Sequence, residues 1–342
     1  MSYKNWVIYS VFTVLSILVF IALINYAVDP LQQFRISSFF PVELKHSEAR
    51  YLNPGIARHY DYDSVVIGTS HAKNFSLAEL DKKLFFSNPV KLTIPGGRAY
   101  EINQVLRIAF KHKIPNKVFF VLDVGSFDGL PTRKHASFQE YLYADGLRNT
   151  LVYLLKFDTT KRSMLAIFSM LKGERYNKEI YADMYVKWKT KSDNVKKIKQ
   201  TTYKRPYQLD VLKDSFEQNI LWHIRENPKT EFTIIHPPYS ILAFIDLSDS
   251  KSLVDVLLFK KYLIEATSSY DNVAIYDFQI AKDITHKLDN YVDITHYYHD
   301  VNSQIIDLIK SEQYRVNLAN VDDINNELAK QVENYLVKED PN

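Results

Sequence analysis

The longest hydrophobic stretch of the chain runs from Trp6 to Val28 and contains no charged side chain. Its 23 residues are enough to cross roughly 30 Å of hydrocarbon as a helix, and Trp6 and Tyr26 suit the two interfaces. A cleaved signal peptide is the alternative, but its apolar core is usually only about 7–15 residues long. Because Lys4 precedes the stretch and Asp29 follows it, we expect an uncleaved anchor with the N-terminus inside and the rest of the chain outside the cytoplasm.

Beyond this stretch, short apolar runs alternate with segments of helical spacing. A continuous run such as Ser64-Val65-Val66-Ile67 indicates a buried strand, whereas apolar residues three and four apart indicate an amphipathic helix. Strands are predicted at 64–70, 89–94, 117–124, 231–236 and 273–278, and helices at 76–84, 100–111, 146–157, 162–171, 209–226, 251–269, 301–311 and 322–337. The pattern predicts an α/β fold, a three-layer doubly wound (flavodoxin-like) parallel sheet of about five strands.

Two segments interrupt the alternation. Residues 30–60 contain three prolines and are interpreted as an irregular tether. A mostly helical insertion at about 128–208 is aromatic and basic, with 14 Lys and Arg against 5 Asp and Glu between Lys156 and Arg205. The expected organisation is an anchor over 1–29, the tether, an α/β domain over 61–318 that carries the insertion, and a C-terminal helix and tail over 319–342.

The basic insertion has two interpretations. It is either a solvated helical cap or a surface for an anionic envelope polymer or lipid headgroups. Nucleic acid is not an expected partner, because the chain has an anchor and lacks any RNA-binding motif. The net charge of +3 argues against polyanion binding by bulk charge, and the absence of cysteine excludes disulfides, thiolate catalysis and cysteine-ligated zinc.

Candidate chemistry lies where the first predicted strand ends in Gly68 and Ser70 follows. A hydroxyl at the carboxyl end of a strand, just before a helix, lies where open α/β sheets bind their ligands. A serine nucleophile needs a base that a third group orients, and Asp293 and His296, after the last predicted strand, can supply both. The oxyanion would be held by the Ser70 backbone N–H and by a glycine after the second strand, Gly96 or Gly97.

These motifs resemble the blocks of the SGNH/GDSL hydrolase superfamily, in its membrane-anchored envelope branch (DltD-like, alginate O-acetylation-protein-like). The first block is similar to residues 68–71, the second to 94–97 and the last to 293–296, and the resemblance covers roughly 60–125 and 230–312. It implies that Ser70 is the nucleophile, His296 the base and Asp293 the acid that orients it. For the oxyanion hole it implies Ser70 and Gly97, with Gly96 as the alternative to Gly97.

The third block departs from the family pattern Gly-x-Asn-Asp, in which the Asn side chain donates to the oxyanion. Here the third predicted strand ends at Asp123 and offers no Asn. A carboxylate there would repel an oxyanion unless it were protonated. Arg98 and Asn103 are candidate substitutes, and otherwise turnover is slow or the site only binds.

Two histidines have competing interpretations. His71 is either structural or substrate-lining rather than the base, because adjacent side chains diverge. His236, before two prolines, either packs at a strand end or lines the pocket. The other candidate lining residues are Gly96, Arg98, Asn103 and Asp123. No cofactor or metal is expected, since a site drawn from His296, His299 and Asp300 has no diagnostic spacing.

The resemblance implies a serine acyltransferase or esterase that is anchored in the bacterial inner membrane and faces out of the cytoplasm. It would transfer O-acetyl or D-alanyl groups through acyl-Ser70, with a cell-envelope polysaccharide or a teichoic-acid-type polymer as its substrate. A membrane-bound O-acyltransferase is the implied partner, beside an anionic or neutral glycan or polyol polymer and the lipid bilayer at residues 6–28. The alternatives are a catalytically weak or inactive polymer-binding subunit, which the missing Asn favours, and a lipid-directed hydrolase.

Overall fold

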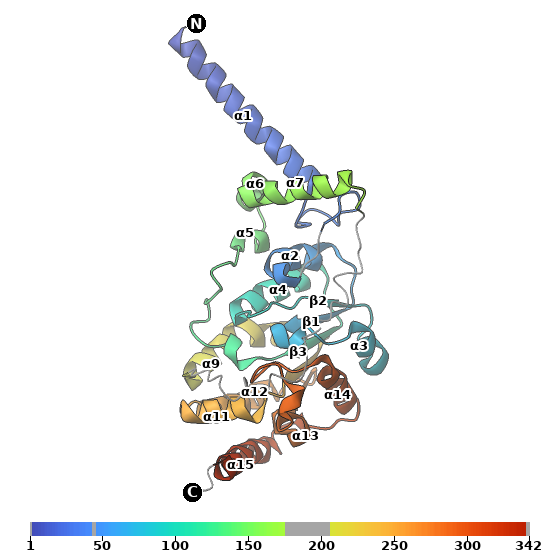
Figure 1. Ribbon diagram of the computed structural model, residues 1–342, viewed down its shortest axis with the longest axis vertical. Coiled ribbons are helices and arrows are strands. Elements are labelled where there is room, and N and C mark those ends of the chain that lie inside the picture. The colour runs from blue at the N-terminus through green and yellow to red at the C-terminus, as the bar shows by residue number, and fades with distance from the viewer. Residues whose placement is uncertain (1, 43–45, 175–205, 340–342) are drawn as a thin grey trace. The chain divides into compact units, whose positions relative to one another are not determined.

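The computed structural model (Figure 1) describes residues 2–42, 46–174 and 206–339. The chain divides into two units. The first unit comprises Met1–Asp61 and Ser137–Tyr181, and the second comprises Tyr62–Ala136 and Ala182–Asn342. The part of the predicted basic insertion at 175–205 lies outside the described residues.

A six-stranded sheet forms the centre of the second unit, in the order β2-β1-β3-β4-β5-β6. The strands are β1 (Ser64–Gly68), β2 (Pro89–Lys91), β3 (Lys117–Val121), β4 (Glu231–His236), β5 (Val273–Asp277) and β6 (Arg315–Val316). The first five are parallel, as predicted, and β6 pairs antiparallel with β5. The pattern did not predict β6, because a strand of two residues is too short to show a period of two.

Helices connect these strands, namely α3 (Leu77–Leu84), α4 (Ala99–His112), α9 (Leu209–Phe216), α10 (Trp222–Glu226), α11 (Ile241–Asp249), α12 (Leu253–Thr267), α13 (Lys282–Thr285) and α14 (His299–Lys310). A last helix, α15 (Val321–Glu339), follows β6. Because β1 lies between β2 and β3, right-handed crossovers place α3 on one face of the sheet and α4, α9 and α12 on the other. Contacts agree with this division, since α14 packs against α3 and α12 packs against α9. Residues 217–221 form a π-helical turn between α9 and α10, where the pattern predicted one uninterrupted helix.

The carboxyl end of β1 needs a glycine. Gly68 pairs in register with Val121 of β3 and has a φ of +142°. A Cβ at this position would come within 2.6 Å of the Val121 carbonyl oxygen, closer than real contacts allow. The chain therefore turns out of the sheet at Gly68, and Ser70 becomes the first residue of a short 3₁₀ helix, η2 (Ser70–Ala72).

The first unit is helical and contains α1 (Tyr3–Val28), the 3₁₀ turn η1 (His46–Glu48), α2 (Ala49–His59), α5 (Glu140–Tyr143), α6 (Leu147–Leu155) and α7 (Phe157–Leu171). Helix α1 is long and apolar enough to cross a membrane. The irregular tether predicted over 30–60 contains α2, with Pro54 inside it. Proline has no N–H for the carbonyl four residues earlier, and the Tyr143 hydroxyl donates to that carbonyl, of Arg50, at 2.7 Å. The helix is thus tolerated because of a partner that is distant in sequence.

Candidate active site

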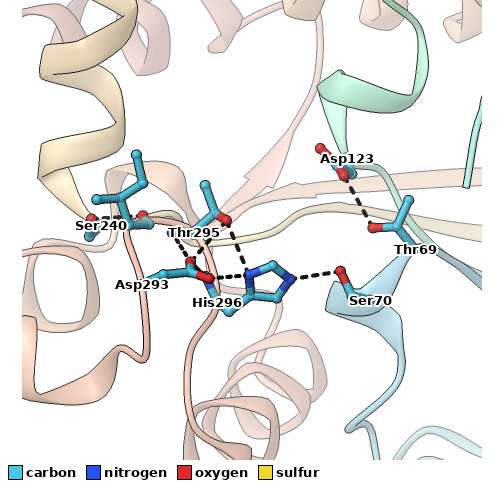
Figure 2. Close-up of polar contacts among 8 residues, drawn as sticks. Thr69, Ser70, Asp123, Ser240, Asp293, Thr295 and His296 are labelled. Atoms are coloured by element: carbon cyan, nitrogen blue, oxygen red, sulfur yellow. Dashed lines mark hydrogen bonds and ion pairs between the residues drawn. The ribbon is translucent and has the colours of Figure 1, made fainter. Parts of the chain in front are cut away.

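Ser70, His296 and Asp293 form a continuous hydrogen-bonded chain at the carboxyl edge of the sheet (Figure 2). The Ser70 Oγ lies 2.7 Å from His296 Nε2. The other ring nitrogen of His296, Nδ1, lies 2.8 Å from Asp293 Oδ2. A carboxylate on Nδ1 holds the proton there and leaves Nε2 as an acceptor for the serine hydroxyl. The structure therefore brings together the three residues that the sequence assigned to one site from positions 226 residues apart.

The loop that carries Asp293 and His296 is held rigidly. Asp293 Oδ1 accepts hydrogen bonds from the backbone N–H groups of Thr295 and His296, both at 2.8 Å. The Ile294 carbonyl accepts from the backbone N–H and the hydroxyl of Ser240, at 3.0 and 2.7 Å (Figure 2). These contacts fix the loop to the segment that follows β4. The His296 imidazole is therefore already positioned beside Ser70, and little conformational entropy is lost when the two react.

The electrostatics of Asp293 favour its charged form. Burial by itself raises the pKa of this carboxyl, but the hydrogen bonds from the His296 ring and from the His296 and Thr295 N–H groups outweigh it. The net pKa lies well below the usual value of 3.8. An ionised Asp293 can stabilise the imidazolium that forms when His296 accepts a proton.

His71 lies against the base rather than in its place. Its ring stacks on the His296 ring with centroids 4.5 Å apart and planes 15° apart. It also contacts the rings of Tyr239 and Tyr297 at 5.2 and 6.2 Å. His71 is buried and lines the cavity beside Ser70, and the stack restricts rotation of the His296 ring.

A cavity of about 210 Å³ opens at the serine. It is lined by Ser70, His71, Gly96, Gly97, Arg98, Asp123, Val124, Gly125, Tyr207, Tyr239, Ala243, Asp246, Leu247, Ile294, Thr295 and His296. Four of the six candidate lining residues, His71, Gly96, Arg98 and Asp123, therefore line it, and so does Gly97, the candidate oxyanion donor. The space is small compared with the roughly 300–1,000 Å³ of drug-sized ligand sites, so it suits a short group.

Asp123 lines this cavity and accepts hydrogen bonds from three neighbouring residues. Its carboxylate accepts hydrogen bonds from the Tyr239 hydroxyl at 2.7 Å and from the Gly125 N–H at 3.0 Å. It also accepts one from the Thr69 hydroxyl at 3.2 Å, which Figure 2 shows. Burial raises the pKa of Tyr239 well above its usual value of 10, and the neighbouring Asp123 charge raises it further. Tyr239 thus stays protonated and donates to Asp123. The Asp123 carboxylate therefore connects Thr69, the residue before the nucleophile, with Gly125 in the turn after β3.

The glycine turn after β2 contains an internal backbone hydrogen bond. The Gly97 N–H donates to the Ile94 carbonyl at 2.8 Å, so in this conformation that N–H is directed to the protein rather than to an oxyanion. Arg98, next in the chain, donates from Nη1 to the Gly125 carbonyl at 2.9 Å. This contact joins the turns that follow β2 and β3 across the cavity.

Two of the candidate lining residues, Asn103 and His236, do not line the cavity, and for His236 this agrees with the interpretation that it packs at a strand end. The Asn103 side chain donates to Asn219 Oδ1 at 3.1 Å and pairs with the ring of His223 at 2.8 Å. Its polar atoms are thus used between α4 and the residues after α9, not as a substitute for the missing third-block Asn. His236 is buried at the end of β4, opposite Asp277 of β5, and its burial lowers the pKa of the imidazole to about 4.

Sequence reasoning missed the wall of the cavity contributed by the segment after β4. Tyr239 follows two prolines there, and Ala243, Asp246 and Leu247 come from α11, a helix that was not predicted. The available signal was position, since this segment follows the carboxyl end of a parallel strand. Within the described ranges, no cluster of three or more His, Asp or Glu residues is arranged to hold a metal ion.

Comparisons with known proteins add little. No protein-family model and no curated protein matches the chain. Among solved structures, one that the chain resembles is a protein from Streptococcus pneumonia, described provisionally as a platelet activating factor. The two share 11% sequence identity over 78% of this chain and 90% of the other, with a TM-score of 0.37. A likeness this low carries no argument about the present chain.

Proposed function

We propose that this protein is a membrane-anchored serine acyltransferase or esterase of the SGNH/GDSL type, with Ser70 as the nucleophile. The observation that carries the proposal is the hydrogen-bonded chain from Ser70 through His296 to Asp293, of which Ser70 and His296 line the cavity. Such a chain supplies what a weak hydroxyl nucleophile lacks, a base within reach and a charge that orients the base.

In the first half-reaction the Ser70 Oγ attacks the carbonyl carbon of an acyl ester or thioester, and the hydroxyl proton passes to His296 Nε2. The tetrahedral intermediate then collapses, the bond to the leaving group breaks, and His296 returns the proton to the leaving oxygen or sulfur. Acyl-Ser70 remains. In the second half-reaction a hydroxyl or water gives its proton to His296 and attacks the acyl carbon, and Ser70 leaves with that proton.

The oxyanion is proposed to bind the Ser70 backbone N–H, at the first position of η2. Gly97 joins as the second donor if its N–H gives up or shares the bond to the Ile94 carbonyl. Asp123 acts here as a structural anion, because Tyr239, Gly125 and Thr69 all donate to it.

The size of the cavity, about 210 Å³, supports a short acyl group, and we propose acetyl or D-alanyl. The acceptor would be a sugar or polyol hydroxyl of a cell-envelope polymer, with a membrane-bound O-acyltransferase as the donor-side partner. Helix α1 would be a single-pass anchor in the bacterial inner membrane, N-terminus inside, with the α/β unit outside the cytoplasm.

The test uses the full-length chain in detergent, treated with p-nitrophenyl acetate and with a fluorophosphonate. Wild type is compared with Ser70→Ala and with a matched control, Ser268→Ala, which removes an exposed serine at the end of α12. We expect a mass adduct on wild type and on Ser268→Ala and none on Ser70→Ala. If wild type forms no adduct with either reagent, the enzyme proposal fails, and a polymer-binding subunit that keeps the fold becomes the better explanation.

A further inference from the structure

Helix α7 buries its small residues and exposes its large apolar ones, which is the reverse of what a surface helix of a soluble protein does. It buries Thr159, Ser163 and Ala166, which are small or polar. It exposes large apolar side chains, namely Phe157, Met164, Leu165, Phe168 and Leu171, with Phe157 at 82% and Leu171 at 72%. Helices in water bury their large apolar residues, whereas helices that face lipid pack through small residues and turn apolar ones outward.

Helix α6 extends this apolar surface. Leu147, Leu151, Val152 and Leu155 are exposed and line a shallow groove together with Arg148 and Lys156. We call the outward apolar side chains of both helices the α6–α7 face, made of Leu147, Leu151, Val152, Leu155, Phe157, Met164, Leu165, Phe168 and Leu171. A patch of nine such side chains on adjacent helices is more than the scattered apolar residues of a soluble surface, and patches of this kind mark interaction sites.

Both helices are attached to the last turns of α1, as Figure 1 shows for this unit. The Asn25 side chain is fully buried and donates to the Leu154 carbonyl at 2.7 Å and to the Thr160 hydroxyl at 2.9 Å. Just after α1, Asp29 accepts from the Tyr153 hydroxyl at 2.8 Å. Helices α6 and α7 are thus fixed to α1 through specific polar contacts.

These contacts determine the position along α1 at which the α6–α7 face lies. Most of the helix between Tyr3 and Asn25 faces outward, and at 1.5 Å per residue its roughly 22 residues span about 33 Å. That is close to the thickness of a bilayer's hydrocarbon core, about 30 Å. The turn to which α6 and α7 attach is therefore where α1 would leave the hydrocarbon.

The charge of the two helices also suits a membrane surface. Residues 147–172 contain five Lys and Arg and a single Asp. Arg148, Lys161 and Lys172 are exposed, and the Asp, Asp158, pairs with Arg162 on the same helix. Basic side chains beside an apolar face are typical of helices that lie in the plane of an anionic lipid interface.

We propose that the α6–α7 face inserts into the headgroup and upper acyl region of the bilayer that α1 spans, as an in-plane second attachment. The proposal rests on the membrane-anchor part of the proposed function and is independent of the chemistry at Ser70. A lipid surface is favoured over a protein partner because the face is continuous with α1 and bordered by basic residues.

The test exploits the absence of cysteine in the chain. Single-cysteine variants of the full-length protein carry a nitroxide spin label in vesicles of phosphatidylcholine and phosphatidylglycerol, and collisions with oxygen and with a water-soluble nickel chelate are measured. Leu165→Cys and Phe168→Cys probe the face. Leu15→Cys, exposed in the middle of α1, is the lipid reference, and Val254→Cys, exposed on α12, is the matched apolar control.

We expect labels at 165, 168 and 15 to collide several-fold more with oxygen than with nickel, and the label at 254 to show the reverse. Water-like values at 165 and 168 beside a lipid-like value at 15 would overturn the inference and leave the anchor intact. Low collision rates with both reagents at 165 and 168 would also overturn it, in favour of a protein contact such as a second copy. A water-like value at 15 would reject the anchor, and this inference with it, while leaving the Ser70 adduct test unaffected.

Discussion

The geometry at Asp293 makes a sharp prediction for the variant Asp293→Asn. Oδ1 accepts two backbone N–H groups at 2.8 Å, and an amide oxygen can keep both bonds. The amide nitrogen must then take the place of Oδ2, where it donates to His296 Nδ1. The imidazole proton moves to Nε2, which now donates to Ser70 instead of accepting from it. The loop keeps its shape, but the base is lost.

The expected loss is large and specific. A base held in the wrong tautomer lowers the rate by roughly 10⁴-fold in sites of this geometry, which corresponds to about 5.4 kcal/mol in activation free energy. The assay is the second-order rate of fluorophosphonate labelling of full-length protein, with the midpoint of thermal unfolding as the check on folding. We expect that midpoint to stay close to the wild-type value.

Thr295→Val is the matched control. It removes a hydroxyl that lies 3.2 Å from Asp293 Oδ1 and 3.4 Å from His296 Nδ1 but keeps the backbone N–H. Losing one neutral hydrogen bond costs about 1 kcal/mol, so labelling should slow by less than about tenfold. The reasoning is refuted if Asp293→Asn slows labelling no more than Thr295→Val does.

Three further outcomes follow from single contacts. Gly68→Ala forces a side chain into a φ of +142° and within 2.6 Å of the Val121 carbonyl, so it should cost at least about 1–3 kcal/mol; a thermal midpoint equal to that of wild type would contradict this. His236 is neutral in the folded protein because burial lowers its pKa to about 4, whereas the unfolded chain protonates near pH 6.5, so stability should fall by up to about 1.4 kcal/mol per pH unit below pH 6.5. Urea unfolding at pH 7 and pH 5 should show a smaller difference for His236→Gln than for wild type, and an equal difference would remove His236 as the cause. Asp123→Asn weakens charge-assisted hydrogen bonds but leaves the triad, so labelling should slow by about ten- to a hundredfold; a loss as complete as that of Ser70→Ala would place Asp123 in the chemistry itself.

Much of the fold was readable from local pattern. The runs that became β1, β3 and β5 each contain an unbroken apolar stretch, as is typical of strands in a parallel sheet that is covered on both faces. Helices α4 and α14 agree with their predicted ranges to within about two residues. The prediction failed at α2, because Pro54 argues against a helix in the sequence. The Tyr143 hydroxyl, from far along the chain, donates to the Arg50 carbonyl that the proline leaves without its usual donor.

For the candidate site, the sequence by itself determined which residue types were available and that they fall after strand ends. Those positions share one edge of a parallel sheet, so the proximity of Ser70 to Asp293 and His296 was predictable from the sequence. Only the tertiary structure decided the rest. Asn103 pairs with Asn219 and His223 instead of reaching the cavity, because the direction of a side chain depends on what packs against its helix.

The same distinction explains the α6–α7 face. Composition alone marked the segment after Lys156 as basic and helical, and it left open whether that surface is solvated or meets an anionic partner. Which side of α7 turns outward is a property of packing, since Thr159, Ser163 and Ala166 are buried while Phe168 is exposed. A sequence records the order of side chains along a helix, but which face is buried depends on the neighbour, and that neighbour, α1, lies more than a hundred residues away in the chain.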